Sequence, residues 1–209
     1  MKTTTQIGLI AAATLLLSST AMALPSAGDS VTFLDKKGTT TGGEFYIDTN
    51  GDQQYDYISF CAEKDEYITM GQTYTIDSVT DYAVAGGNGA VDGKDYLSAA
   101  TKWVMANYIL NQGIFYEETR TVGMINDVQN IIWALEEEIS GYASQRYLDV
   151  LAQEDYSFEG SVWVLNLNTA AGGLAQSQII YEPVPEPTTM LLFGAGMLGL
   201  AAVARRREQ

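Results

Sequence analysis

The sequence predicts an α+β fold, in which a β-rich barrel or sandwich carries an inserted group of about three helices. Thirteen tyrosines, together with many Thr, Val and Ile, favour strands over much of the chain. Apolar and polar residues alternate before about residue 85 and again after about residue 160. Between these stretches the apolar spacing changes to three and four residues, which is typical of helices.

The first strands are expected to form a hairpin. Residues 43–49 and 53–60 alternate large apolar and polar side chains, and Asn50-Gly51 lies between them. This dipeptide tolerates the positive φ angles of a tight turn, so the pattern predicts a β-hairpin with Cys61 at the end of its second strand. Further strands are predicted at Tyr74–Val79, Val162–Leu167 and Gln178–Tyr181.

The same hairpin has an alternative interpretation as a calcium loop, because acidic and amide side chains recur at Asp48, Asn50, Asp52 and Asp56. However, glycine falls at the fourth position of this loop instead of the sixth, and no glutamate occupies the twelfth. The hairpin is therefore favoured, and the sequence predicts neither a metal site nor a cofactor.

Three helices are expected in the middle of the chain. The first begins near Asp95 and ends at Asn111-Gln112-Gly113, a typical helix C-terminus. The second runs from about Gly123 to Ile139 and the third from about Ala143 to Gln153. The second helix has one apolar stripe, formed by Met124, Val128, Ile131, Leu135 and Ile139.

The N-terminus has the features of a secretory signal. Lys2 precedes the apolar run Ile7–Leu17, and Ala21-Met22-Ala23 offers the small residues that signal peptidase accepts. Residues 1–23 are therefore predicted to be a signal peptide, and the mature chain is expected to begin at Leu24.

The C-terminus carries a second apolar segment, Thr188–Ala204, which has no charged residue. Its length is at the short limit for a membrane-spanning helix. Arg205, Arg206 and Arg207 follow directly, and such basic residues stay on the cytoplasmic side. We therefore expect a transmembrane helix at 188–204, a cytoplasmic basic tail at 205–209, and a body on the outer side of the inner membrane.

A linker at 183–187 joins this helix to the body. It contains Val184-Pro185-Glu186-Pro187, and its prolines favour an extended, accessible chain. Pro-Glu-Pro, a short apolar helix and a terminal arginine cluster resemble the PEP-CTERM sorting signal. The resemblance implies processing by an exosortase, a membrane cysteine protease, and delivery to the cell surface or extracellular matrix.

The body, residues 24–182, is long enough for one domain with its own core. Residues 24–187 hold seven basic and 25 acidic residues, a charge that repels nucleic acid and anionic membranes. The chain has no histidine, which excludes serine-histidine and cysteine-histidine catalysis.

The single cysteine, Cys61, is unusual for an exported protein, where thiols generally pair. It is interpreted as a buried apolar residue, as half of an intermolecular disulfide, or as a thiol kept for other chemistry. On the second helix, Gln129 lies between Ile125 and Trp133, on the shoulder of the apolar stripe. From that position its amide can contact a neighbouring strand, although a glutamine on the shoulder of a stripe is more often solvated.

The segments around Cys61 and Gln129 resemble the bacterial thioester domain over roughly residues 44–182. They are Phe60-Cys61-Ala62-Glu63, a helix with Trp103 and Tyr108-Ile109-Leu110, and Val128-Gln129-Asn130-Ile131-Ile132-Trp133-Ala134-Leu135. This chain departs from the family pattern at Val128, where the family has threonine, and at Ile131, where it has alanine. The resemblance implies an internal thioester in which Cys61 supplies the sulfur and Gln129 the acyl carbon.

Three functions follow from these features. The first is a surface or matrix protein that attaches covalently to partners bearing primary amines. The second is a non-covalent structural component of an extracellular polysaccharide matrix, with Cys61 merely buried. The third, a hydrolase, is disfavoured, because acidic pairs such as Asp155 and Glu159 are frequent in so acidic a body. The protein is therefore not expected to be an enzyme.

Overall fold

A six-stranded antiparallel barrel forms the base of the molecule in our computed structural model, which describes residues 23–84, 87, 90–116, 118–184, 194 and 196. Its strands follow the order β1-β2-β3-β8-β7-β4, and pairing of β1 with β4 closes the barrel. They are β1 (Ser30–Lys37), β2 (Glu44–Asp48), β3 (Tyr57–Cys61), β4 (Thr73–Thr80), β7 (Ser161–Asn168) and β8 (Leu174–Glu182). The prediction of a barrel or sandwich thus resolves to a barrel.

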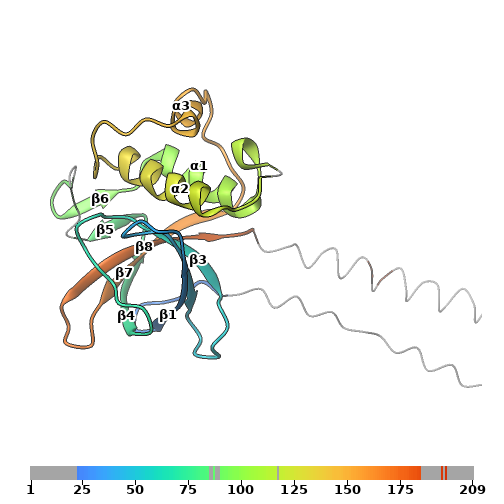
Figure 1. The fold of residues 1–209 in the computed structure, drawn as a ribbon. Coiled ribbons are helices and arrows are strands. Elements are labelled where there is room, and N and C mark those ends of the chain that lie inside the picture. The colour runs from blue at the N-terminus through green and yellow to red at the C-terminus, as the bar shows by residue number, and fades with distance from the viewer. Residues whose placement is uncertain are drawn as a thin grey trace, which may run out of the picture.

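The helices are inserted between β4 and β7 and cover one side of the barrel (Figure 1). A small two-stranded sheet precedes them. The inserted elements are β5 (Tyr82–Val84), β6 (Lys94–Tyr96), α1 (Ala99–Leu110), the short 3-10 helix η1 (Gly113–Phe115), α2 (Val122–Leu135) and α3 (Gln145–Leu151). The α+β class with three α-helices is therefore confirmed for the described residues.

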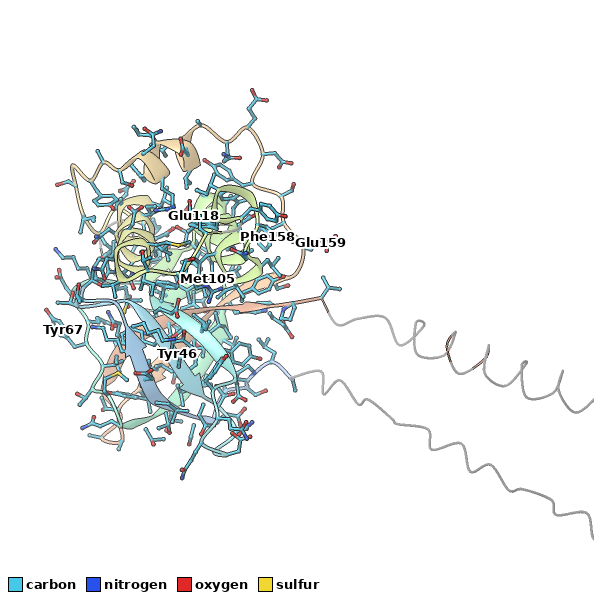
Figure 2. All side chains as sticks on the ribbon, turned by 45° about the vertical axis from the view of Figure 1, so that its right-hand side comes forward. Tyr46, Tyr67, Met105, Glu118, Phe158 and Glu159 are labelled. Atoms are coloured by element: carbon cyan, nitrogen blue, oxygen red, sulfur yellow. The ribbon has the colours of Figure 1, made fainter. Side chains whose placement is uncertain are left out.

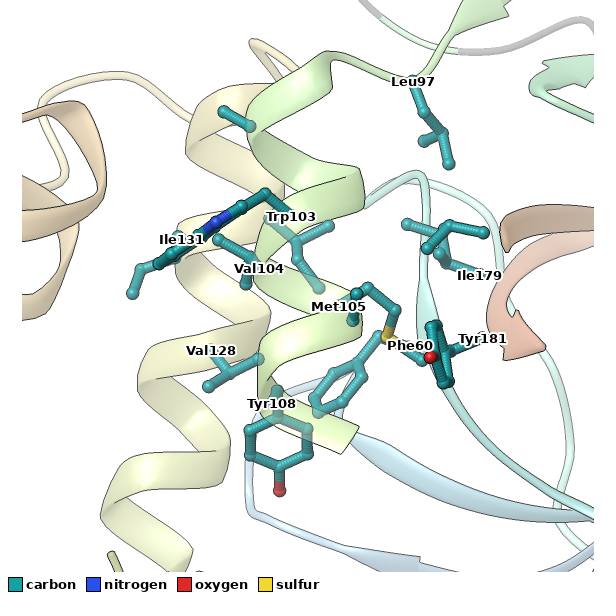
Figure 3. Packing of buried hydrophobic residues seen from close by; sticks show 14 of the residues in the cluster. Phe60, Leu97, Trp103, Val104, Met105, Tyr108, Val128, Ile131, Ile179 and Tyr181 are labelled. Atoms are coloured by element: carbon teal, nitrogen blue, oxygen red, sulfur yellow. The ribbon is translucent and has the colours of Figure 1, made fainter. Parts of the chain in front are cut away.

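Two apolar cores hold this arrangement together. The first fills the barrel and includes Phe33, Phe45 and Ile180. The second lies between barrel and helices, where Met105 of α1 and Val128 of α2 pack with Phe60 of β3 (Figure 3). Because α1 is buried on most of its faces, its sequence lacks a clear polar stripe.

Helix α2 has the local signals of a stable helix. The Thr121 hydroxyl accepts a hydrogen bond from the Met124 N–H and caps its first turn. Met124, Ile125, Val128, Ile131 and Ile132 are all buried, so the apolar stripe faces the barrel as expected. This orientation carries Gln129 onto the end of β3.

Two predicted boundaries were wrong. The first helix begins at Ala99 and not near Asp95, because Ser98 caps it and residues 94–96 form β6. The second helix ends at Leu135 instead of Ile139, with Glu136 as its C-cap.

The predicted turn at Asn50-Gly51 was also wrong. β2 and β3 pair as an antiparallel hairpin, but residues 49–56 form the loop between them. The cause is the pair of carboxylates at its two ends. Asp48 accepts backbone N–H groups of Asn50, Gly51 and Gln53, and Asp56 accepts the Thr49 N–H.

The predicted signal peptide, apart from residue 23, and the spanning helix at 188–204, apart from two isolated positions, lie outside the described residues. Among the residues that the structure does describe, every helix is too short or too polar to span a membrane.

Candidate functional site

The Gln129 side chain of α2 bonds directly to the backbone of Cys61 at the end of β3. Its Oε1 accepts the N–H of Cys61 at 3.0 Å and the N–H of Gly43 at 2.9 Å. Its Nε2 donates to the Cys61 carbonyl oxygen at 3.0 Å. The two predicted site residues are thus adjacent, and the hydrogen bonds between them use the backbone of Cys61.

The register of the hairpin explains why a third group takes part. Phe45 pairs with Ser59, so two residues further on Gly43 stands opposite Cys61. There the Gln129 carboxamide bridges the two strands, one residue before β2 begins. A glutamine is long enough to reach the sheet from the helix, and its amide presents a donor and an acceptor as a peptide group does.

The site is fully enclosed. Cys61 and Gln129 both have 0% of their surface exposed. Gly42 covers the carboxamide so closely that a Cβ on this residue would lie 2.6 Å from Gln129 Oε1 and 2.8 Å from Trp133 Cζ2. Glycine is thus needed here for close approach of the backbone, and any ligand must displace this cover.

The Cys61 sulfur lies on the barrel side of β3 and contacts its cross-strand neighbour. Nε2 of Gln178 is 3.8 Å from Sγ, and Ser59 donates to Oε1 of the same amide at 2.9 Å. Burial raises the pKa of the Cys61 thiol to about 12, although Gln178, Lys36 and the Gly43 N–H each lower it in part. The Gly43 N–H therefore acts on both the sulfur and the Gln129 oxygen.

The loop that carries Gly42 is fastened to α2 one turn before Gln129. Oδ1 of Asn126 accepts the N–H groups of Thr39 at 2.7 Å and Thr40 at 3.3 Å. Nδ2 of the same amide donates to the Thr39 hydroxyl at 2.7 Å. Two amides on one face of α2, three residues apart, thus hold the loop and the strand ends together.

A buried carboxylate next to Gly43 was missed by the sequence analysis. Glu44 is 0% exposed, and its two oxygens accept the hydroxyls of Tyr46 and Tyr108. Arg120 lies 3.8 Å from Glu44 Oε2 and over the Tyr108 ring. Nothing in the local pattern signals this cluster, because its members come from three separate segments. It fixes the start of β2 and therefore the position of Gly43.

The acidic loop at 49–56 does not gather its carboxylates around a cation. Asp48 and Asp56 are occupied by backbone and side-chain donors, as the hydrogen bonds to Thr49 and Asn50 show. Across the described part of the chain, no group of three or more acidic or cysteine side chains could hold a metal ion.

The predicted sorting residues fall at the edge of the described chain. Val184 is exposed two residues after β8 ends. Pro185, Glu186 and Pro187, as well as Arg205, Arg206 and Arg207, lie outside the described residues.

Comparison with known proteins identifies this end of the chain. Residues 183–207 match the family model described as the PEP-CTERM protein-sorting motif. No curated protein and no solved structure matches the chain. The motif supports an exported protein that is anchored in the membrane by its C-terminal segment and sorted by an exosortase. These comparisons lend no support to the resemblance to the thioester domain, so the thioester stays a prediction.

Proposed function

We propose that this exosortase substrate is a surface or matrix protein whose body forms an internal thioester between Cys61 and Gln129. The observation that carries the proposal is the pair of backbone N–H groups, from Gly43 and Cys61, on the Gln129 carbonyl oxygen. Donors at about 2.7–3.1 Å are what stabilise the oxyanion of acyl transfer. The two donors lie 2.9 and 3.0 Å from the carboxamide oxygen of unreacted Gln129, so both already face the atom on which the negative charge would develop.

The proposed reaction uses these two donors. The Cys61 sulfur adds to Cδ of Gln129, and the negative charge that develops on Oε1 is stabilised by the two N–H groups. The C–N bond then breaks, and the thiol proton leaves with the nitrogen as ammonia. The product is a thioester, with a good thiolate leaving group on an electrophilic carbon. The low dielectric of the enclosed site strengthens both hydrogen bonds.

The proposed function is attachment and not turnover. A primary amine of a partner attacks Cδ, an amide bond forms to Gln129, and Cys61 is released as a thiol. The chain is consumed in the process, so the protein is not an enzyme. Access requires the loop around Gly42 to move, because both reacting side chains are buried.

Intact mass of the mature exported protein tests this proposal. The expected mass is one ammonia below the sequence mass, and Gln129→Ala restores the full value. Gln178→Ala is the matched control, because this second glutamine also contacts the sulfur but lies outside the two-donor arrangement. It should keep the mass deficit. A full mass, with Cys61 alkylated once the protein is denatured, would falsify the thioester.

A second candidate is a non-covalent structural component of the extracellular polysaccharide matrix. It is favoured by the buried thiol, whose raised pKa keeps sulfur protonated at neutral pH. In this case Gln129 only fastens α2 to the barrel. Binding of a Cys61→Ala variant to matrix material decides between the two, since only the covalent mode requires sulfur.

A further inference from the structure

A shallow apolar pocket lies where the folded body ends and the sorting signal begins. It encloses about 290 Å³ and is lined by the tyrosines Tyr55, Tyr57 and Tyr181, by the end of α1 at Ile109 and Leu110, and by Pro183. Tyr55 is 57% exposed, so its ring is accessible to a partner at the edge of the pocket. Nothing in the proposed thioester chemistry uses this pocket.

Both ends of the body meet at this face. The Tyr57 hydroxyl donates to the carbonyl oxygen of Ala23 at 3.4 Å, beside the predicted signal-peptide cleavage site. The other end, Pro183, lines the pocket itself. The start of the described chain and the end of β8 accordingly lie on the same side of the molecule (Figure 1).

The distance to the sorting motif is short. Pro187 is four residues beyond Pro183, and an extended chain covers at most about 14 Å in four residues. A protease that takes Pro185–Pro187 into its active site must therefore come within this distance of the pocket. Because a folded protease is far larger than 14 Å, it has to lie against the face that contains the pocket.

The charge around the pocket argues against a lipid partner. Asp56 lines it, and the Tyr181 hydroxyl donates a hydrogen bond to the backbone carbonyl oxygen of a second acidic residue, Glu159. Residues 24–187 as a whole hold 25 acidic and seven basic residues. An anionic bilayer would be repelled, whereas a protein surface can offer an apolar side chain to an aromatic pocket.

We propose that this pocket is a docking surface for the exosortase that processes the sorting signal. A side chain of the enzyme enters between the three tyrosines and the end of α1 while the motif occupies the active site. Contact with the body adds to the binding of the motif, so processing depends on the folded domain as well as on the tail. The proposal rests on the sorting motif and is independent of the thioester.

Pulse-chase labelling of the full precursor in cells that contain the exosortase tests the proposal. The double variant Tyr55→Ala/Ile109→Ser should lose its C-terminal tail about fivefold more slowly than the wild type, with the same rate of signal-peptide removal. Tyr67→Ala is the matched control. Tyr67 is an exposed tyrosine on the opposite side of the body (Figure 2), and its loss should leave the rate unchanged.

A second variant separates docking from folding. Twelve Gly and Ser residues inserted between Val184 and Pro185 let the enzyme reach the motif away from the body, so the double substitution should have no effect in this background. The proposal is overturned if the double variant is processed at the wild-type rate, or if its defect persists with the insertion. It is also overturned if the released wild-type protein, but not the double variant, sediments with phosphatidylethanolamine–phosphatidylglycerol vesicles, which would assign the pocket to lipid.

Discussion

At the scale of single residues, buried polar groups determine how the helices meet the barrel. Gln129 is 0% exposed and still makes three hydrogen bonds, two as acceptor and one as donor. An apolar residue at this position would leave the N–H groups of Gly43 and Cys61 buried without acceptors, at a cost of about 1–3 kcal/mol each. This need explains a glutamine among apolar residues whether or not a thioester forms.

Glu63, two residues after Cys61, is the second buried polar group near the site. Glu63 is 2% exposed. Neither its Oε1 nor the Oε2 of Glu66 meets an N–H or hydroxyl donor among the described residues. Burial, reinforced by Glu66, raises the pKa of Glu63 to about 9. Burial likewise raises the pKa of Glu66. The raised pKa keeps the Glu63 carboxyl group protonated at neutral pH.

We expect this pair to make the protein less stable as the pH rises. The folded pKa of Glu63, about 9, is above the ordinary value of 4.5, so its contribution is complete below about pH 4.5 and is lost as the pH rises through 9. Glu63→Gln keeps the shape without the charge. At pH 8 it should raise the free energy of unfolding by about 4–5 kcal/mol, with little change at pH 4.

Urea unfolding at pH 4, 6 and 8 measures this effect. Glu154→Gln removes an exposed carboxylate and is the control, with an expected change near zero. If Glu63→Gln destabilises the protein equally at all three pH values, the raised pKa of Glu63 is wrong and its carboxyl group is ionised in the folded state.

The sequence could predict part of this residue-level picture. The position of Gln129 on the shoulder of an apolar stripe allowed contact with a strand but by itself favoured a solvated amide, whereas the structure buries Gln129 completely. Helical periodicity gives the direction of a side chain but not the strand that it meets, so the bonds to Gly43 and to the Cys61 backbone could not be predicted. Glu44 and Glu63 were missed because acidic residues are common throughout this chain.

At the scale of elements, one serine joins the start of α1 to the end of α2. The Ser98 hydroxyl accepts the Thr101 N–H at 3.1 Å and donates to Oε1 of Glu136 at 2.8 Å. The Ser98 N–H also donates to Glu136. A carboxylate at the C-terminus of its own helix is unfavourable, but here it also lies at the N-terminus of α1, where negative charge is stabilised.

Ser98→Ala should therefore lower the free energy of unfolding by more than the loss of an ordinary helix cap does. Thr121→Ala removes the cap of α2 alone and should lower the free energy of unfolding by about 1 kcal/mol. Ser98→Ala also removes a donor from Glu136, which is 6% exposed, and we expect a loss of about 2–3 kcal/mol.

Chemical denaturation of the two variants at pH 7 gives the comparison. In a Glu136→Gln background, the excess cost of Ser98→Ala over Thr121→Ala should shrink, because hydrogen bonds to charged groups are stronger than those to neutral groups. Equal losses for both caps in the wild-type background would mean that the bond to Glu136 adds nothing.

The hairpin shows why element boundaries are hard to derive from a sequence. Asn50-Gly51 correctly marked a reversal of the chain, and β2 and β3 do pair. The turn type was wrong, because the carboxylates of Asp48 and Asp56 supply acceptors for the loop backbone and replace the bonds of a two-residue turn. A turn rule that considers two central residues does not include these side chains.

At the scale of the whole molecule, the order of the strands in the sheet could not be predicted from the sequence. Alternation indicates which strands have a buried face, and it supported both a sandwich and a barrel. Closure depends on β1, whose Val31 and Phe33 pack inside while its other end carries Asp35, Lys36 and Lys37. This charged end obscured the strand in the sequence, and without it the pairing of β1 with β4 cannot be inferred.

The acidic surface has two opposing effects on the stability of the whole body. Added salt weakens the repulsion among the 24 acidic residues of the body, but it also weakens ion pairs such as Arg146 with Glu118 and Lys102 with Asp81. Exposed pairs contribute little, about 0–1 kcal/mol each. Repulsion acts between every pair of charges closer than the Debye length, which falls from about 30 Å at 0.01 M to about 8 Å at 0.15 M.

Because the acidic residues outnumber the basic ones so strongly, the relief of repulsion should dominate. We expect the midpoint of thermal unfolding at pH 7 to rise by about 3–5 °C between 10 mM and 300 mM NaCl, which corresponds to roughly 1 kcal/mol for a domain of this size. At pH 4 many carboxylates are protonated, so the same addition should have a smaller effect. A midpoint that falls with salt at pH 7 would mean that ion pairs outweigh net charge, and an equal rise at both pH values would assign the effect to salt exclusion from the surface instead.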